Sequence, residues 1–164
     1  MIEDEEYQKL LKRALHLISI RPRSIHDIKK RLSTPPRGQT VPLRLVDGVI
    51  EKLIKLKLVD DRAFCVWLIE SRKRTNRKGH DSIKFELLGQ GIAVDLVTEV
   101  LSQELSGDDE YRMARNLLEK KTKLYTSLPQ KEKKTKLLGH LLRRGFSPSL
   151  AYRVIDEMLG KDVQ

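Results

Sequence analysis

Five cations between residues 72 and 78 have the clearest potential for binding chemistry in this sequence. This cluster, called the 72–78 cluster below, consists of Arg72, Lys73, Arg74, Arg77 and Lys78. Lys and Arg at this density can neutralise the phosphates of nucleic acid, and such binding is strongly salt-dependent and nearly blind to base sequence. Cations also suit the negative C-terminal end of a helix. A polyanion contact and plain helix-end charge therefore both stay open. If the helix continues through Lys78, Lys73 shares a face with Arg77, and Arg74 with Lys78.

Three further groups of cations lie near expected helix ends or on an expected helix face. They are Arg21 with Arg23, the run Lys29, Lys30 and Arg31, and the pair Arg143 and Arg144. Each group can be read as a binding surface or as ordinary helix-surface charge. The lysines between residues 131 and 136 fit solubilising charge better.

Acidic pairs, histidines and glycines do not combine into an enzyme site. Asp60-Asp61 and Asp108-Asp109 could hold a metal, but both pairs recur at expected helix starts, where carboxylates cap free amides. None of the 4 histidines has another histidine four residues away, as a metal-binding helix often has. Gly89-Gln90-Gly91 lacks the strand and the third glycine of a dinucleotide loop. We therefore expect no enzymatic activity, no metal site and no cofactor.

Helices must position these side chains. Charged residues make up 34% of the chain and aromatic residues 5%, which is typical of helical proteins with thin cores. So few aromatic rings disfavour modules that stack bases on them. Apolar residues recur at helical spacing, and turns such as Thr34 to Gly38 and Asn76 to Gly79 separate eight or nine helices without a strand. Ser24 to Asp27 fits a capping box, and Ser147-Pro148 fits a capped helix start.

The single cysteine and the absence of a targeting segment bear on the compartment. Cys65 excludes both an intramolecular disulfide and a cysteine zinc site, and we expect it to lie in the core together with Trp67. The first residues are acidic, unlike a secretory signal, and no apolar run of about 18 residues follows. We expect a soluble cytoplasmic protein with no membrane partner.

A repeat of about 50 residues organises the helices. Gly91 to Leu101 aligns without a gap with Gly145 to Ile155, and Val41 to Ile50 forms a third copy. Upstream, Ile28 and Leu32 match apolar pairs in the other two copies when the loop at Pro35-Pro36 counts as an insertion. The repeat predicts an all-α protein of three three-helix units, at residues 1–58, 59–107 and 108–164.

The division into three units has consequences for how they pack and for how the net charge is distributed. A three-helix unit of this size buries little surface alone, so we expect the three repeats to stack into an elongated, curved rod. The chain has a net charge of +10, to which the three units contribute +6, −1 and +5. We therefore expect a negatively charged partner.

The sequence resembles the RecX family, the regulatory proteins that act on filaments of the RecA recombinase. The residues that carry the resemblance are Arg21-Pro22-Arg23-Ser24 before Ile28 and Leu32, Leu58-Val59-Asp60-Asp61 before Phe64 and Arg72, Gly79, Ile83, Glu86-Leu87 and Gly91-Ile92, Lys120-Lys121, Lys136-Leu137 through Leu141, and Arg143-Arg144-Gly145-Phe146-Ser147. No single motif is specific, but their order and spacing cover nearly the whole chain.

This resemblance implies three tandem three-helix units and no enzymatic activity. It also implies binding in the groove of the RecA-DNA filament, where the protein inhibits filament extension, ATP hydrolysis and strand exchange in DNA repair and recombination. Single-stranded DNA would be contacted directly or through RecA, and we expect a monomer. The RecA or DNA contacts would then come from the 72–78 cluster and from the three groups of cations named above.

Two other functions are compatible with parts of the sequence. The paired helices from Ile28 to Ile50, and their copies, could act as helix-turn-helix units of an autonomous DNA-binding protein. The third helices offer mostly apolar and acidic residues, such as Asp95 and Asp156, which disfavours base reading. A nuclease suits a basic protein, but no metal-binding carboxylate group or activated nucleophile can be assembled.

Overall fold

A computed structural model describes residues 2–34, 41–75 and 77–160, and within these ranges the chain forms nine α-helices and no strand. The helices are α1 (Ile2–Ile20), α2 (Ile25–Ser33), α3 (Leu43–Lys55), α4 (Asp61–Arg74), α5 (His80–Gly89), α6 (Val94–Glu104), α7 (Gly107–Leu124), α8 (Gln130–Arg143) and α9 (Pro148–Gly160). The all-α prediction is confirmed. The expected turns at residues 35–38 and at Asn76 lie outside the described residues.

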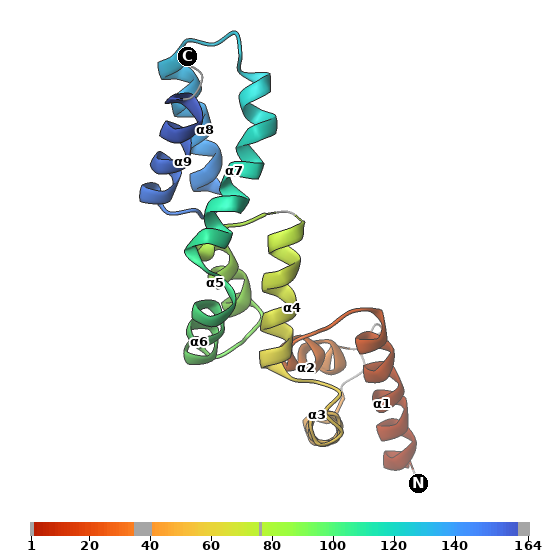
Figure 1. Cartoon of the computed structure of the whole chain (residues 1–164). Coiled ribbons are helices and arrows are strands. Elements are labelled where there is room, and N and C mark those ends of the chain that lie inside the picture. The colour runs from red at the N-terminus through yellow and green to blue at the C-terminus, as the bar shows by residue number, and fades with distance from the viewer. Residues whose placement is uncertain (1, 35–40, 76, 161–164) are drawn as a thin grey trace. The chain divides into compact units, whose positions relative to one another are not determined.

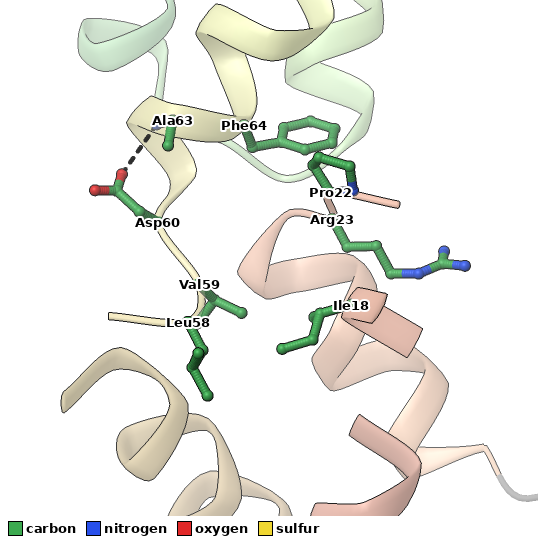
Figure 2. A pocket seen from close by; sticks show the side chains of 8 residues that line it. All are labelled: Ile18, Pro22, Arg23, Leu58, Val59, Asp60, Ala63 and Phe64. Atoms are coloured by element: carbon green, nitrogen blue, oxygen red, sulfur yellow. Dashed lines mark hydrogen bonds between the residues drawn. The ribbon is translucent and has the colours of Figure 1, made fainter. Parts of the chain in front are cut away.

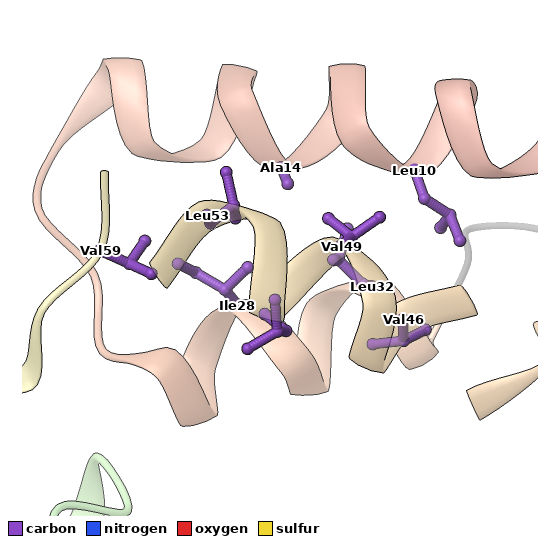
Figure 3. Packing of buried hydrophobic residues seen from close by; sticks show 9 residues of the cluster. Leu10, Ala14, Ile28, Leu32, Val46, Val49, Leu53 and Val59 are labelled. Carbon is purple, nitrogen blue, oxygen red and sulfur yellow. The ribbon is translucent and has the colours of Figure 1, made fainter. Parts of the chain in front are cut away.

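The first three helices enclose a core of aliphatic side chains (Figure 3). Its buried members are Leu10 and Ala14 from α1, Ile28 and Leu32 from α2, Val46, Val49, Ile50 and Leu53 from α3, and Val59 after α3. Ile28 and Leu32 lie one helical turn apart, so they form one stripe on α2, as the sequence period predicts. Their burial positions the neighbouring Lys29, Lys30 and Arg31 on the exposed side of α2.

The last three helices pack in the same way (Figure 1). Leu118 of α7, Leu137 and Leu141 of α8, and Val154 and Ile155 of α9 are all buried. The apolar columns found by aligning the sequence with itself are therefore core columns.

The chain divides into two compact units, and the middle three helices contribute to both. The first unit contains Met1–Trp67 and Leu87–Val97, and the second contains Leu68–Glu86 and Thr98–Gln164. The expected boundaries at residues 58 and 107 stay predictions.

Within the first unit, the turn between α5 and α6 contacts the start of α2. The hydroxyl of Ser24, which is fully buried, donates a hydrogen bond of 2.8 Å to the carbonyl of Gln90. The amide of Ile25 donates to a carboxylate oxygen of Asp61, at the start of α4, over 2.9 Å. Gly91 has φ +74°, and a Cβ there would lie 2.3 Å from the ring of His26. Only glycine fits this approach.

Within the second unit, the turn between α8 and α9 contacts the start of α5 in the same manner. The Gly79 amide donates to the Arg144 carbonyl over 2.8 Å, and the His80 amide donates to a carboxylate oxygen of Glu110 in α7 over 2.8 Å. Gly145 has φ +81°, and a Cβ there would lie 2.3 Å from the Ser82 hydroxyl. We call this arrangement, present once in each unit, the joint. In both joints an acid from the first helix of one repeat bonds the first amide of the second helix of the preceding repeat.

Helix caps agree with the sequence in most places. Ser24 caps α2, but the expected capping box is wrong, because the Asp27 carboxylate pairs with Arg23 and Arg31 instead. Asp60 accepts hydrogen bonds from the amides of Arg62 and Ala63, as expected for a capping carboxylate.

The two remaining caps involve serine hydroxyls. Ser106 and Asp109 form a complete capping box at the start of α7. The bonds from Ser106 hold the pKa of Asp109 well below its usual range. Ser147 accepts a hydrogen bond from the Leu150 amide at 3.3 Å, which confirms the expected start of α9.

Candidate polyanion-binding surface

The structure brings carboxylates from other helices onto the 72–78 cluster. Arg72 donates to both carboxylate oxygens of Glu86 in α5, and the ammonium of Lys78 lies 3.0 Å from the same carboxylate. The hydrogen bond from Arg72, opposed by partial burial, lowers the pKa of Glu86. Glu86 is therefore ionised and holds α4, the loop after it and α5 together.

Two more carboxylates neutralise the end of α4. Lys73 lies 2.9 Å from a carboxylate oxygen of Glu70 and 3.3 Å from one of Asp109, whereas Arg74 lies 3.7 Å from Glu70. The helix ends at Arg74, so the face shared with Arg77 and Lys78 in a longer helix does not form.

Arg77 completes the cluster in a half-buried position. Its Nε is buried and has no hydrogen-bond partner among the described residues, while its carbonyl accepts a bond of 3.4 Å from Arg144. Four of the five cations in the cluster, Arg72, Lys73, Arg74 and Lys78, thus pair with three carboxylates. Much of the charge that dominates the sequence here serves the internal structure of the second unit.

The N-terminal cations divide into paired and exposed side chains. Only 8% of the Arg23 side chain is exposed, and it bonds Asp27 over 2.8 Å and the Leu17 carbonyl over 3.0 Å. Lys29 pairs with Asp47 over 2.6 Å, and Arg31 pairs with Asp27. Arg21 and Lys30 are exposed and make no ion pair with a described residue.

The largest excess of positive charge lies on α7 and α8. Residues 115–144, called the basic hairpin below, contain ten Lys and Arg but only two acidic residues. Within the described chain, Arg115, Lys134 and Lys136 have carboxylate partners in ion pairs, at 3.9, 2.6 and 3.9 Å. Lys120, Lys123, Lys131 and Arg143 are exposed and form no ion pair with any residue that the structure describes.

A histidine lies within this positive surface. His140 shares a face of α8 with Arg143 and Arg144, which follow it by three and four residues. Burial, together with the charges of Lys121, Arg144 and Arg143, lowers the pKa of His140 below its ordinary value. Burial and the nearby positive charges therefore both oppose protonation of the imidazole.

Sequence reasoning named Arg143 and Arg144, but not Lys121 or His140, as candidate contact residues. The sequence carries a signal for both, because the basic hairpin has a higher net charge than the 72–78 cluster has after pairing. Local density of cations was a poor guide, since the neutralising carboxylates come from other helices.

Other candidate sites are weaker. A pocket of about 260 Å³ in the first unit is lined mostly by apolar side chains, with Arg23 and Asp60 at its edge (Figure 2). Both charged groups are already engaged, Arg23 with Asp27 and Asp60 with helix amides, so neither is available to orient a ligand. Among the residues that can be described, no three or more His, Cys, Asp or Glu gather as a metal would require.

Two further observations concern the single cysteine and the apolar length of the helices. Cys65 is buried as predicted, and burial raises the pKa of its thiol to about 11. In the part of the chain with described structure, no helix is both long and apolar enough to cross a membrane.

Comparisons with known proteins agree on one family. Residues 108–155, which include the basic hairpin, match the model of the third three-helix domain of RecX. Over 158 residues the chain is 32% identical to the regulatory protein RecX of Bacillus subtilis, an alignment that covers 94% of this chain and 56% of the relative. The chain thus spans about half the length of the curated relatives it matches.

Solved structures share the fold. RecX from Lactobacillus salivarius superposes with a TM-score of 0.80 at 23% identity, covering 94% of this chain and 97% of that one. A second crystal structure, of a regulatory protein RecX, gives a TM-score of 0.79 at 25% identity, with 94% and 74% covered. The domain match, the similarity along nearly the whole sequence and the shared fold all point to RecX proteins as what this chain resembles.

Proposed function

We propose that this protein regulates RecA recombinase in DNA repair and recombination, and that it does so without catalysing a reaction itself. The observation that carries the proposal is similarity to regulatory RecX proteins along 94% of the chain. The match to a RecX domain over the basic hairpin supports a role for that surface. The protein acts in the cytoplasm as a monomer.

The proposed mode of action is binding in the groove of the RecA-DNA filament. There the protein inhibits ATP hydrolysis, filament extension and strand exchange. The unpaired cations of the basic hairpin suit a polyanion partly covered by protein, because they gain carboxylate or phosphate partners on docking. Paired cations such as Arg72 and Lys73 would first have to give up existing ion pairs. We therefore favour Arg143 over the 72–78 cluster as a contact residue.

The test is ATP hydrolysis by RecA on single-stranded DNA, titrated with the full chain. We expect ATP hydrolysis to be suppressed when far less than one copy of this protein is present per RecA monomer. Triple replacement of Lys121, Lys123 and Arg143 by Gln should weaken the inhibition at least about tenfold, because several charge-assisted contacts are lost. Replacement of Lys12, Lys52 and Lys55, three exposed lysines of the first unit, by Gln is the matched control and should change little.

If the native protein left ATP hydrolysis by RecA unchanged, RecA regulation would be contradicted. If the protein nevertheless bound bare DNA, autonomous DNA binding would replace RecA regulation as the proposed function. The distribution of acidic residues argues against that alternative. Asp95 and Glu99 are exposed on the third helix of the middle repeat, where a helix-turn-helix protein would carry its base-reading side chains.

A further inference from the structure

His140 occupies a position with an unusual electrostatic environment. Gly139 has no side chain, and the guanidinium of Arg143 folds over it, so that Nη1 lies 3.1 Å from where a Cβ would be. This places the Arg143 guanidinium against the α8 backbone at Gly139, the residue that precedes His140. Arg144, one residue further along α8, is anchored to the Arg77 carbonyl over 3.4 Å.

Besides burial, the charged groups that lower the pKa of His140 are all positive. Lys121 contributes from α7, and Arg143 and Arg144 contribute from α8 itself. The charged groups of α9, the other helix packed on α8, are engaged elsewhere, in contacts that are described next.

The charged side chains of α9 satisfy one another and their neighbours. Asp156 pairs with Lys134, Glu157 accepts a hydrogen bond from Tyr111, and Arg153 lies over the Tyr111 ring at 5.0 Å. No carboxylate among the residues described for this unit pairs with His140. A ligand would have to supply the missing negative charge.

We propose that Lys121, His140, Arg143 and Arg144 form a binding site for a phosphate of a nucleic-acid backbone, and that this site binds its phosphate together with a proton on His140. The choice of nucleic acid as the polyanion rests on the proposed function. The clustering of these four cationic or protonatable groups is independent of that function.

The coupling follows from electrostatics. In the free protein, burial and three neighbouring cations disfavour the imidazolium, so His140 is neutral near neutral pH. A phosphate among the same groups offsets part of their positive potential and gives the imidazolium an anionic partner, which favours the charged imidazole. Binding therefore takes up a proton, and by linkage the affinity rises as the pH falls towards the pKa of the free histidine. Below that pKa, both states carry the proton and the gain levels off.

The experiment measures binding of a fluorescent oligothymidylate to the full chain by anisotropy. The ionic strength is held constant while the pH varies from about 8 to about 5.5, a range that brackets the ordinary pKa of histidine. One coupled proton gives at most a tenfold change in affinity per pH unit. We expect the native chain to bind about threefold to tenfold more tightly at the acidic end.

Variants separate the histidine from the cations. His140→Gln should keep the affinity measured near pH 8 and lose most of the increase on acidification. His16→Gln, which alters an exposed histidine of α1, is the matched control and should keep the full increase. Arg143→Gln should weaken binding at every pH and reduce its salt dependence by about one phosphate contact.

A second readout follows the imidazole itself. The ring resonances of His140, recorded by NMR against pH, should show a higher pKa when the oligonucleotide is bound. An unchanged pKa, a His140→Gln variant that retains the pH dependence, or a native chain that binds no oligonucleotide would each overturn the proposal. Binding of polyaspartate instead would assign the surface to an acidic protein.

Failure of this site and failure of the proposed function give different results. If RecA turnover is suppressed but oligonucleotide binding ignores His140, the phosphate site is wrong and the regulatory role stands. If binding depends on His140 but RecA turnover never changes, the site stands without RecA regulation.

Discussion

Lys57 is the residue whose backbone departs most from what its type prefers. Its φ is +56°, and it is the only non-glycine with a positive φ in the described chain. It lies just after α3, where the Leu58 amide bonds the Leu53 carbonyl and the Lys57 amide bonds the Ile54 carbonyl. This is a Schellman motif, which favours glycine at the left-handed position. Gly145 occupies the same position after α8.

Replacing Lys57 by Gly should therefore stabilise the protein. The left-handed conformation costs a lysine about 1 kcal/mol or more, and glycine removes this cost. Glycine also adds conformational entropy to the unfolded chain, which cancels part of the stabilisation. We expect a net increase of about 0.5 kcal/mol in the free energy of unfolding, measured by urea denaturation. Lys55→Gly, inside the last turn of α3, is the control and should destabilise by about 0.5–1 kcal/mol. Destabilisation by both changes would show that Lys57 is not strained.

At the scale of elements, the joints determine how one repeat meets the next. In each joint a glycine-containing turn packs so closely on the start of a helix that no side chain fits between them. The sequence located these turns through Gly91 and Gly145, and it aligned them correctly. It could not reveal what they touch, because His26 and Ser82 lie more than sixty residues before their glycine partners.

Gly145→Ala should be strongly destabilising. Alanine would have to adopt the positive φ of this position, and its methyl group would overlap the Ser82 hydroxyl. We therefore expect the free energy of unfolding to fall by more than about 2 kcal/mol. Gly89→Ala is the matched control, because a Cβ at Gly89 has no heavy atom within 4 Å. That change should be neutral or stabilise α5 by up to about 1 kcal/mol. Thermal unfolding of both variants checks the prediction, and equal effects would contradict a tightly packed joint.

At the scale of the whole molecule, the periodic pattern of apolar residues was enough to predict an all-α chain and its core. Leu32, Leu87 and Leu141, for example, were placed in equivalent positions of the three repeats, and all are buried. Which cations form ion pairs and which stay exposed was harder to predict. The cations of the 72–78 cluster are neutralised by Glu86 and Asp109, which approach only after α5 and α7 fold against α4. The rod-like stacking and the contacts with RecA stay predictions.

The joints also mean that the repeat seen in the sequence differs from the cooperative unit of folding. The amides of Ile25 and His80 begin the second helices of their repeats, where no bond within the helix protects them. Each is protected only by a carboxylate from the following repeat, Asp61 or Glu110. Their hydrogen-exchange rates should therefore report the opening of the next repeat along the chain.

Replacement of Glu110 by Gln should accelerate exchange at His80 and leave Ile25 unchanged. Asp61→Asn should do the reverse. NMR-detected exchange under native conditions would measure both rates. Equal acceleration of the two amides by either variant would mean that the repeats open together. Exchange restricted to one amide would mean that each repeat is closed by the first helix of its successor, so the protein can open one repeat at a time.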